Sequence, residues 1–251
     1  MKLDLDGKCA LITGGTRGVG KAIAVKLAEQ GVHLALNYFR NRKAAEETAQ
    51  EIAAISGHKP LLLKANVGDP EKVKDMFLTL KETFSQIDFV ISNAASGVLK
   101  PAQELSKRHL EWTMEINAYA LMYLSQSAVP MMPEGGRIIA VSSLGSVRAI
   151  PNYTAVGASK AALESMVRHL SVELAPKINV NTLSAGVIDT EALTHFPNRE
   201  ALLAESERKT PAGRLTLPED VADVALFLCS KLADMIYGQT ITVDGGYSIL
   251  S

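Results

Sequence analysis

Residues 9–20 read CALITGGTRGVG, a short apolar run that passes directly into a glycine-rich turn. Gly14, Gly18 and Gly20 allow the chain to turn tightly and let backbone N–H groups approach a phosphate at the positive end of a following helix. A glycine motif standing alone is weak, because structural turns imitate it. Here it opens the first of several strand–helix units, which is the context that the motif requires. The stretch therefore predicts a dinucleotide-binding turn in an α/β fold.

Short apolar runs alternate with helical patterns along nearly the whole chain. The runs are continuously apolar, as in parallel strands that are buried on both faces. They are CALIT from Cys9, HLALNY from His33, LLLKANV from Leu61, FVISNA from Phe89, RIIAVSS from Arg137, INVNTLSA from Ile178 and TITVDGG from Thr240. Repeated units of this length need right-handed crossovers, which place helices on both faces of the sheet. We predict one α/β domain over residues 1–251, a doubly wound, seven-stranded parallel sheet.

The overall composition suits one globular domain. Of the 251 residues, 47% are hydrophobic and 21% are charged, and the net charge is −1. So small a charge gives no bulk attraction to nucleic acid or to an anionic membrane, and no apolar run is long enough to span a bilayer. The two cysteines, Cys9 and Cys229, do not make a disulfide framework. We expect a cytoplasmic protein with no nucleic-acid or membrane partner, and no metal site is predicted.

The end of the second strand bears on the choice between NADH and NADPH. A site for the unphosphorylated cofactor usually has a carboxylate there, which binds the ribose hydroxyls. Here the strand ends Asn37-Tyr38-Phe39-Arg40 without an acid, and Arg17 lies inside the glycine turn. Two guanidinium groups suit a 2′-phosphate, and no carboxylate repels it. We predict NADPH; the alternative is that Arg40 is an ordinary solvated charge.

A lysine lies on the apolar face of a predicted helix, residues 153–174. Lys160 shares one stripe with Val156 and Leu163. A buried ammonium is unfavourable unless it is paired, and hydroxyls of a nicotinamide ribose would pair with it. The alternative is a lysine that extends to the helix edge. Tyr153 precedes Lys160 by seven positions, about 10 Å along the helix axis, so both share a face. Tyr153 is therefore a candidate proton donor, or else a packed aromatic near the helix start.

The stretch from Asp189 to Thr216 interrupts the alternation of strands and helices. It is polar and charged around His195-Phe196-Pro197 and follows a strand's carboxyl end, where ligands bind in such sheets. We predict an irregular substrate lid over residues 189–216, with a surface insertion as the alternative. Cationic side chains in it could meet an acidic partner or simply be solvated. They are Arg199, Arg208, Lys209 and Arg214.

Several motifs together resemble the short-chain dehydrogenase/reductase superfamily over essentially the whole chain. They are TGGTRGVG, ANV from Ala65, SNAA from Ser92, Asn117 in a helix, the pair Ser142 and Ser143, and VDGG near the end. Within it, SSLGSVRAIPNYTAVGASKAALE and SAGVIDT are similar to bacterial enoyl-[acyl-carrier-protein] reductases. With AASGVLKPAQEL and HFPNRE, the pattern most resembles the NADPH-dependent type III. The resemblance implies a Rossmann fold, a homotetramer, and reduction of trans-2-enoyl thioesters on acyl carrier protein in fatty-acid elongation.

The same resemblance implies which residues surround the cofactor. Asn66 and Val67 would border the adenine, residues 93–95 would follow the ribose, and Ile188 would help to hold the carboxamide. The expected cofactor contacts are Gly14, Thr16, Arg17, Gly18, Val19, Gly20, Tyr38, Arg40, Asn66, Val67, Asn93, Ala94, Ala95, Lys160, Gly186 and Ile188.

Val156 occupies the position, four residues before the lysine, where most reductases of this build have a tyrosine. Valine cannot donate a proton, so the acid would be Tyr153, about one turn earlier. A ketone reductase protonates the oxygen on the carbon that is reduced. In enoyl reduction, charge develops on the thioester oxygen, two carbons from the reduced β-carbon, so its hydrogen-bond donor must lie farther out. A shift of about 5 Å along the axis matches this displacement. The spacing favours an enoyl reductase with Tyr153 and Lys160 in catalytic roles.

Ser143 is a third catalytic candidate, and it departs from the more widespread enoyl reductases. Those have a second tyrosine at this position and a looser phosphate loop. Ser143 precedes Lys160 by 17 residues, the interval of the catalytic serine in carbonyl reductases. It would either hydrogen-bond the thioester oxygen or cap the strand end. The rival functions are a carbonyl reductase of the same fold, such as a 3-oxoacyl-carrier-protein reductase, and a non-catalytic NADPH-binding protein.

Overall fold

A parallel β-sheet organises the protein. The structure, a computed structural model, describes residues 3–189 and 199–250. The strands are β1 (Cys9–Thr13), β2 (His33–Tyr38), β3 (Leu61–Lys64), β4 (Phe89–Ser92), β5 (Gly136–Ser143), β6 (Ile178–Ala185) and β7 (Thr240–Val243). They form a 7-stranded sheet in the order β3-β2-β1-β4-β5-β6-β7, and each neighbouring pair is parallel. The predicted doubly wound parallel sheet is confirmed.

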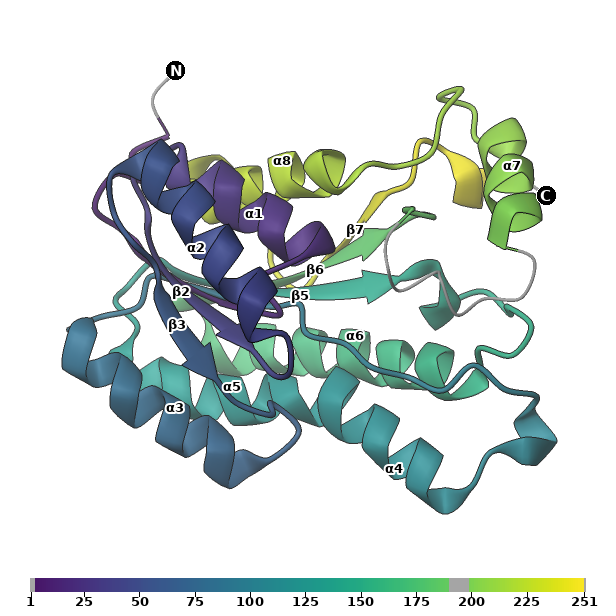
Figure 1. The fold of residues 1–251 in the computed structure, drawn as a ribbon, viewed down its shortest axis with the longest axis horizontal. Coiled ribbons are helices and arrows are strands. Elements are labelled where there is room, and N and C mark those ends of the chain that lie inside the picture. The colour runs from purple at the N-terminus through teal and green to yellow at the C-terminus, as the bar shows by residue number, and fades with distance from the viewer. Residues whose placement is uncertain (1–2, 190–198, 251) are drawn as a thin grey trace.

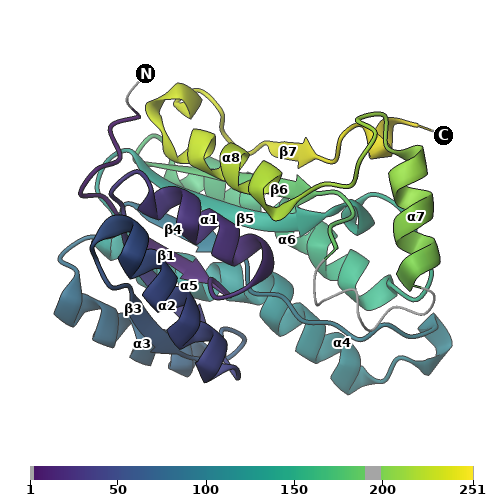
Figure 2. The ribbon, with the colours of Figure 1, turned by 45° about the horizontal axis from the view of Figure 1, so that its top comes forward.

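Helices cover both faces of this sheet. They are α1 (Gly18–Ala28), α2 (Arg42–Ser56), α3 (Pro70–Thr83), α4 (Lys107–Met114), α5 (Ala120–Ala128), α6 (Thr154–Leu174), α7 (Arg199–Lys209) and α8 (Pro218–Cys229). One layer consists of α1, α2 and α8, and the opposite layer contains α3, α5 and α6 (Figure 1). In the second view, α7 stands beyond the sheet, close to the C-terminus of the chain (Figure 2). Among the described residues, no helix combines the length and apolar character needed to cross a bilayer.

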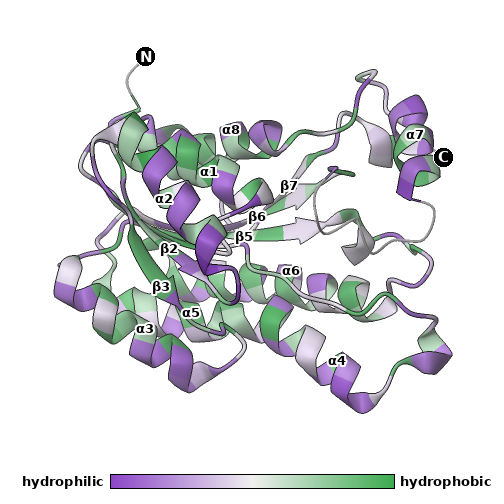
Figure 3. Ribbon diagram, viewed as in Figure 1, coloured by the Kyte–Doolittle hydropathy of each residue, from purple (hydrophilic) through white to green (hydrophobic). Residues whose placement is uncertain are grey.

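The sheet separates two hydrophobic cores. Successive residues of a strand face opposite sides, so Leu11 and Val90 belong to the core beneath α3, α5 and α6. Ile12 and Ile91 belong to the core beneath α1 and α8. Polar residues gather on the outer faces of the helices, as the hydropathy colouring of α2 and α3 illustrates (Figure 3). The continuous apolar strand runs are thus explained by burial on both faces.

The strand order reverses direction between β1 and β4, and this position creates the site. To one side of β1 the chain builds β2 and β3; to the other side it builds β4 to β7. The chain leaves β1 for α1 on one face of the sheet and leaves β4 for α5 on the other face (Figure 1). Such a reversal point is the usual ligand position in open α/β sheets. The glycine turn at residues 14–17 and the loop from Asn93 leave the sheet there.

Several element boundaries differ from the sequence prediction, among them the start of β5 at Gly136 and the end of β7 at Val243. Strand β3 ends at Lys64 and β4 ends at Ser92, so Ala65–Val67 and Asn93–Ala94 are loop rather than strand. Helix α6 begins at Thr154, and Tyr153 is its N-cap, with φ −110° and ψ 8°. These shifts matter because residues just past a strand end can turn towards a ligand, whereas residues within the ladder cannot.

The segment predicted as an irregular lid contains a regular helix. Residues Arg199–Lys209 form α7, with Glu200 in the first turn and two basic residues in the last. This charge order matches the helix dipole. The expectation of irregular chain is therefore wrong for this part, while His195-Phe196-Pro197 lies outside the described residues. Whether residues 189–216 act as a substrate lid stays a prediction.

Candidate active site

The glycine turn has the geometry that a phosphate-binding loop requires. Gly14 and Gly18 have φ of 60° and 50°, in the left-handed region that disfavours residues with a Cβ. Arg17 is the N-cap of α1 but makes no side-chain capping hydrogen bond. The first-turn N–H groups of a helix have no intrahelical acceptor, so this helix end suits an anion. The turn therefore fits a pyrophosphate group.

Gly20 packs closely against the turn and the side chain of Asn93. A Cβ added there would lie 2.3 Å from the carbonyl oxygen of Gly14 and 2.5 Å from Nδ2 of Asn93. Those atoms belong to the protein, so Gly20 is needed for the close approach of α1 to the turn. The absence of a side chain at Gly20 thus helps to set the shape of the turn.

Asn93 also holds the glycine turn in place. Its Nδ2 donates to the carbonyl oxygens of Thr13 and Gly14, at 3.0 and 3.1 Å. The N–H groups of Asn93 and Ala94 both donate to Oγ1 of Thr13, each at 3.0 Å. The ends of β1 and β4 are thus fastened together by side chains. Sequence reasoning placed Asn93 to Ala95 along a ribose and did not predict this bracing.

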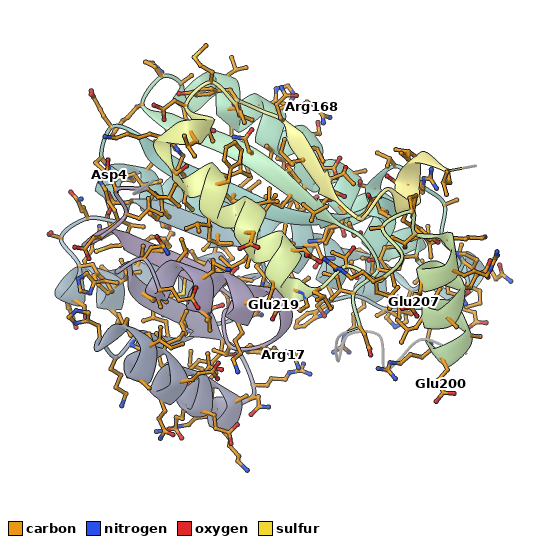
Figure 4. The ribbon with its side chains drawn as sticks, turned by 90° about the horizontal axis from the view of Figure 1, so that it is seen from above. Asp4, Arg17, Arg168, Glu200, Glu207 and Glu219 are labelled. Carbon is orange, nitrogen blue, oxygen red and sulfur yellow. The ribbon has the colours of Figure 1, made fainter. Side chains whose placement is uncertain are left out.

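The end of β2 presents aromatic and cationic groups. The Arg40 guanidinium lies over the Phe39 ring, 5.3 Å from its centroid, which limits where this exposed cation can point. Arg17 extends outward from the start of α1 (Figure 4). Both cations leave the same edge of the sheet, because Arg40 follows β2 and Arg17 follows β1. Tyr38 ends β2 beside Lys64 of β3.

The loop after β3 is fixed by hydrogen bonds of its own. Nδ2 of Asn37 donates to the carbonyl oxygens of Leu63 and Ala65, at 3.2 and 3.1 Å. The Asn66 side chain accepts from the N–H of Gly68 at 3.2 Å, and Val67 is buried. These bonds hold residues 65–68 against the end of β2, next to the glycine turn.

Tyr153 and Ser143 come together at the carboxyl end of β5. Their hydroxyl oxygens share a hydrogen bond of 3.3 Å. Burial raises the pKa of the Tyr153 phenol, and the hydrogen bond with Ser143 opposes the rise. The phenol is therefore protonated at neutral pH and can act as a hydrogen-bond or proton donor. Ser143 does pair with a side chain of the candidate site, so it does more than cap the strand end.

The Tyr153 ring is positioned by a close backbone contact. A Cβ on Gly145 would lie 2.4 Å from the ring, so only glycine allows this packing. Beside the ring is a hollow of about 290 Å³, lined by the loop from Gly145 to Ile150 and by the first turns of α6.

Lys160 is buried on the inner face of α6, as its stripe position predicted. Only 5% of the residue is exposed, and burial lowers the pKa of its ammonium from 10.5 to about 8. Its Nζ donates to the carbonyl oxygen of Val141 at 2.7 Å. The alternative of a lysine extending to the solvent is thereby wrong. An ammonium has three donors, which leaves capacity for further hydroxyl acceptors.

Val156 fills the position where carbonyl reductases of this build have a tyrosine. It is buried, and a Cβ on Gly97 would lie 2.2 Å from its Cγ2. The side chain thus contacts the loop that follows β4. A valine side chain has no proton to donate, so residue 156 cannot act as the acid.

Asn117, one of the motif residues noted in the sequence, connects three loops and helices behind the site. It lies in a π-helical turn, Glu115–Tyr119, between α4 and α5. Such turns are frequent at functional sites. Its Oδ1 accepts from the N–H of Ser96 at 2.8 Å, and its Nδ2 donates to Ser159 of α6 at 3.0 Å. Trp112 donates to Ser96 through Nε1 at 3.0 Å. The motif pointed to Asn117 itself, but this network of hydrogen bonds was not predicted.

Gly186 and Ile188 follow β6 at the same edge. Gly186 is enclosed by Thr216 and Asp244, since a Cβ would lie 2.7 Å from Oγ1 of Thr216. Ile188 is buried in the core beneath α1 and α8. The apolar side chain of Ile188 is therefore engaged with the protein core.

The four cations of the predicted lid region all have acidic partners. Arg199 pairs with Asp189, and Arg214 pairs with Asp220. Arg208 and Lys209 both bind Glu205, at 2.8 and 3.0 Å, and they lower the pKa of that carboxyl to about 2. These local pairs reduce the net positive field that would attract an acidic carrier protein.

Comparison with known proteins agrees with this arrangement. A family model described as Enoyl-(Acyl carrier protein) reductase matches residues 14–248. The chain belongs to the short-chain dehydrogenase/reductase family. This confirms the resemblance identified from the sequence motifs, and the protein is accordingly an oxidoreductase.

The names of individual relatives refer to different substrates. The 1-cyclohexenylcarbonyl-CoA reductase of Streptomyces collinus is 38% identical over 245 residues, 96% of this chain and 87% of that protein. A versicolorin reductase of Emericella nidulans is 35% identical over 254 residues, with 96% of both chains covered. The crystal structure of a Bacillus cereus enoyl-acyl carrier protein reductase with NADP⁺ and indole naphthyridinone is 32% identical. It matches with a TM-score of 0.93 over 100% of both chains.

Proposed function

We propose that this short-chain dehydrogenase/reductase uses NADPH to reduce the carbon–carbon double bond of trans-2-enoyl thioesters. The observation that carries the proposal is the placement of one donor and the absence of another. Tyr153 is the N-cap residue of α6, and its hydroxyl shares a hydrogen bond with Ser143. The buried Val156 fills the position one turn closer to Lys160. The donor is therefore displaced along the helix in the direction that enoyl chemistry needs.

The glycine turn, the strand ends and Lys160 would hold the cofactor. The uncapped start of α1 suits the pyrophosphate, and Arg17 and Arg40 suit a 2′-phosphate. Lys160 would donate to the hydroxyls of the nicotinamide ribose. When bound, NADPH supplies the two electrons of the reduction. The Bacillus cereus relative contains NADP⁺, which supports the phosphorylated cofactor.

Tyr153 would stabilise the charge that develops on the thioester oxygen. Reduction at the β-carbon moves an electron pair towards that oxygen, and a donor already in place lowers the energy of the resulting enolate. Because the raised pKa keeps the phenol protonated, Tyr153 can donate a hydrogen bond at neutral pH. Ser143 restrains the phenol through their shared hydrogen bond. A proton then reaches the α-carbon, from tyrosine or from water, and completes the saturated thioester.

The helix geometry favours enoyl over carbonyl reduction. A tyrosine at position 156 would stand about 6 Å from Lys160 along the axis, whereas Tyr153 stands about 10 Å away. The nearer position serves an oxygen on the carbon being reduced. The farther position serves an oxygen two carbons away.

Relatives support both the proposal and its rival. The name of the Streptomyces relative describes a ring double bond conjugated to a thioester carbonyl, which is the bond arrangement proposed here. The versicolorin reductase represents a different kind of substrate on the same fold. A carbonyl reductase therefore remains the second candidate. Its support is Ser143, which stands in that class's serine position.

Three reactions test these functions. NADPH oxidation is followed by the loss of absorbance at about 340 nm in three separate reactions, with crotonyl-CoA, with acetoacetyl-CoA and without substrate. The rate of each reaction is compared with that of a Tyr153→Phe control. The proposal expects consumption with crotonyl-CoA alone. Consumption with acetoacetyl-CoA alone would establish the carbonyl reductase. NADPH binding without turnover on either substrate would favour the non-catalytic protein.

The carrier of the acyl group is a further part of the proposal. Fatty-acid elongation would present the enoyl group on acyl carrier protein, and the cations near α7 would meet it. Their pairing with Asp189, Glu205 and Asp220 reduces this attraction. Reversing Arg208 and Lys209 to glutamate should weaken turnover of the carrier-linked substrate more than that of crotonyl-CoA. Equal effects would argue against carrier docking on α7.

A homotetramer in the cytoplasm completes the proposal. Large apolar side chains are exposed on the outside of α6 and after α8, with Val172 at 80% and Met235 at 92% exposure. Burying such groups against other copies would be favourable. Light scattering of the purified protein should give the mass of four chains; a single-chain mass at assay concentration would contradict this part.

A further inference from the structure

A buried carboxylate lies one helical turn beyond Lys160. Glu164 is 7% exposed and sits four residues after the lysine on α6. Residues at this spacing are neighbours on a helix, with Cβ atoms about 5–6 Å apart. A carboxylate is rarely buried unless it is paired or serves a purpose. The mechanism proposed above does not use it.

The end of β5 binds both this carboxylate and the lysine. The hydroxyl of Ser142 donates to Oε1 of Glu164 at 2.6 Å. The preceding residue, Val141, accepts the Lys160 ammonium through its carbonyl oxygen. The following residue, Ser143, bonds Tyr153. Three consecutive strand residues therefore bind Lys160 and Glu164 of α6 and the N-cap residue Tyr153.

Glu164 opposes the effect of burial on the lysine. Burial lowers the pKa of Lys160 to about 8, and the negative charge of Glu164 raises it. Without that charge the pKa would be lower still. The carboxylate thus favours the ammonium form.

Other ionisable groups around α6 are engaged elsewhere or lie at the surface. Strand β6 and the turn Leu144–Ser146 contain none. Strand β5 contains Arg137, which pairs with Asp234. The π-helical turn contains Glu115, which accepts a hydrogen bond from Tyr123 of α5, and the exposed Tyr119.

The remaining ionisable groups belong to α4 and to α6 itself. On α4, Lys107, Arg108 and Glu111 are exposed and His109 is bonded to Ser106 in the helix cap. On α6, Arg168, His169 and Glu173 are exposed, and Tyr153 is the phenol at its start. Among the described residues, Glu164 is the buried charge placed to act on Lys160.

We propose that Glu164 is a positioning residue that keeps Lys160 protonated for cofactor binding, and that Ser142 fixes its carboxylate. This inference rests on the proposed role of Lys160 in holding NADPH. It predicts that NADPH binding weakens as pH rises through the titration of Lys160. Removing the charge at position 164 moves this loss to lower pH.

The test is the pH dependence of NADPH binding without acyl substrate. Trp112 is the one tryptophan of the chain, so energy transfer from its indole to bound NADPH reports the dissociation constant. Glu164→Gln keeps the size and the acceptor for Ser142 but removes the charge. We expect its dissociation constant to be about three- to tenfold higher than that of the unaltered protein near pH 8.5, and within about twofold near pH 6.5.

Matched variants separate a charge effect from a structural one. Glu173→Gln removes an exposed carboxylate from the same helix and should leave the profile unchanged. Ser142→Ala should move the loss of binding in the same direction by a smaller amount, and Glu164→Asp should restore most of the original profile. Lys160→Met should remove the alkaline loss altogether. Thermal unfolding confirms that each variant is folded, and if Glu164→Gln is not, the aspartate and Ser142 variants decide.

Each outcome supports or overturns the inference. An unmoved profile in folded Glu164→Gln overturns it, and so does weakening by the same factor at every pH, or an alkaline loss that persists in Lys160→Met. A protein that shows the shifted profile but reduces no enoyl thioester would contradict the proposed function and support this inference. An active enoyl reductase whose pH profile of NADPH binding is unchanged in Glu164→Gln would support the proposed function and contradict this inference.

Discussion

The phenol oxygen of Tyr153 lies 3.3 Å from the hydroxyl oxygen of Ser143, across the gap between the start of α6 and the end of β5. This distance joins the candidate acid to the strand that also holds Lys160 through Val141. The two groups thereby share one support. A change in the register between β5 and α6 would move the acid and the lysine together.

Replacing Tyr153 with phenylalanine should remove the donor and retain the ring packed on Gly145. We expect turnover of an enoyl thioester to fall by about 10²- to 10⁴-fold, the usual contribution of a positioned acid. The dissociation constant of NADPH should change less than about twofold. Steady-state kinetics and fluorescence titration measure the two effects. Tyr237→Phe, which removes an exposed phenol bonded to Pro176, is the control, and an active Tyr153→Phe enzyme would exclude this residue as the donor.

Replacing Gly20 with alanine should disrupt the glycine turn. The added Cβ would meet the Gly14 carbonyl oxygen at 2.3 Å, and backbone cannot move away without displacing the turn. Overpacking of this kind costs about 1–3 kcal/mol of unfolding free energy, and NADPH binding should weaken markedly. Denaturant unfolding and NADPH titration provide the measurements. Gly57→Ala adds a Cβ in open space at a helix end, so it should lose some stability but bind NADPH normally.

Replacing Arg40 with alanine should reduce the preference for NADPH. A charge-assisted hydrogen bond to the 2′-phosphate contributes about 1.5–3 kcal/mol, so kcat/KM with NADPH should fall about tenfold or more. With NADH it should change little. Arg42→Ala removes a neighbouring cation whose partner is Glu46 and serves as the control. If both cofactors lose activity equally, the phosphate assignment for Arg40 is wrong.

Replacing Lys160 with methionine should stabilise the cofactor-free protein at neutral pH. The drop of the pKa from 10.5 to about 8 corresponds to about 3 kcal/mol of unfolding free energy. Between these two pKa values the unfolded chain binds more protons than the folded one, so stability rises with pH through that range. Below about pH 8 the full cost of burying the charged lysine lowers the unfolding free energy. The difference in unfolding free energy between the original protein and Lys160→Met should therefore shrink as pH rises from about 8 towards 10.5. Urea unfolding at several pH values measures it, and a constant difference would contradict the expectation.

Much of this protein could be predicted from local sequence. The parallel sheet follows from continuous apolar runs, and the strands β1, β2 and β6 begin and end at the predicted residues. The positive φ of Gly14 and Gly18 follows from the residue type. The burial of Lys160 follows from its place in the stripe. Each of these depends on neighbours within a few turns of the chain.

Other features could not be predicted from the sequence and became visible only in the folded structure. The helix at Arg199–Lys209 was predicted as irregular because its polar sequence has no apolar stripe to reveal it. The bracing of the glycine turn by Asn93, the network around Asn117 and the bond between Ser142 and Glu164 join residues far apart in sequence. No pattern within one segment predicts them.

Periodicity, glycine placement and the spacing of Tyr153 and Lys160 determined the fold class, the cofactor turn and the face on which the catalytic candidates lie, because backbone sterics and burial act over short stretches of chain. Which side chains meet across that face was decided only by the tertiary structure. A hydrogen bond such as that between Ser143 and Tyr153 depends on strand register and on the rotation of α6 to within a fraction of an ångström, and packing of the whole sheet sets both.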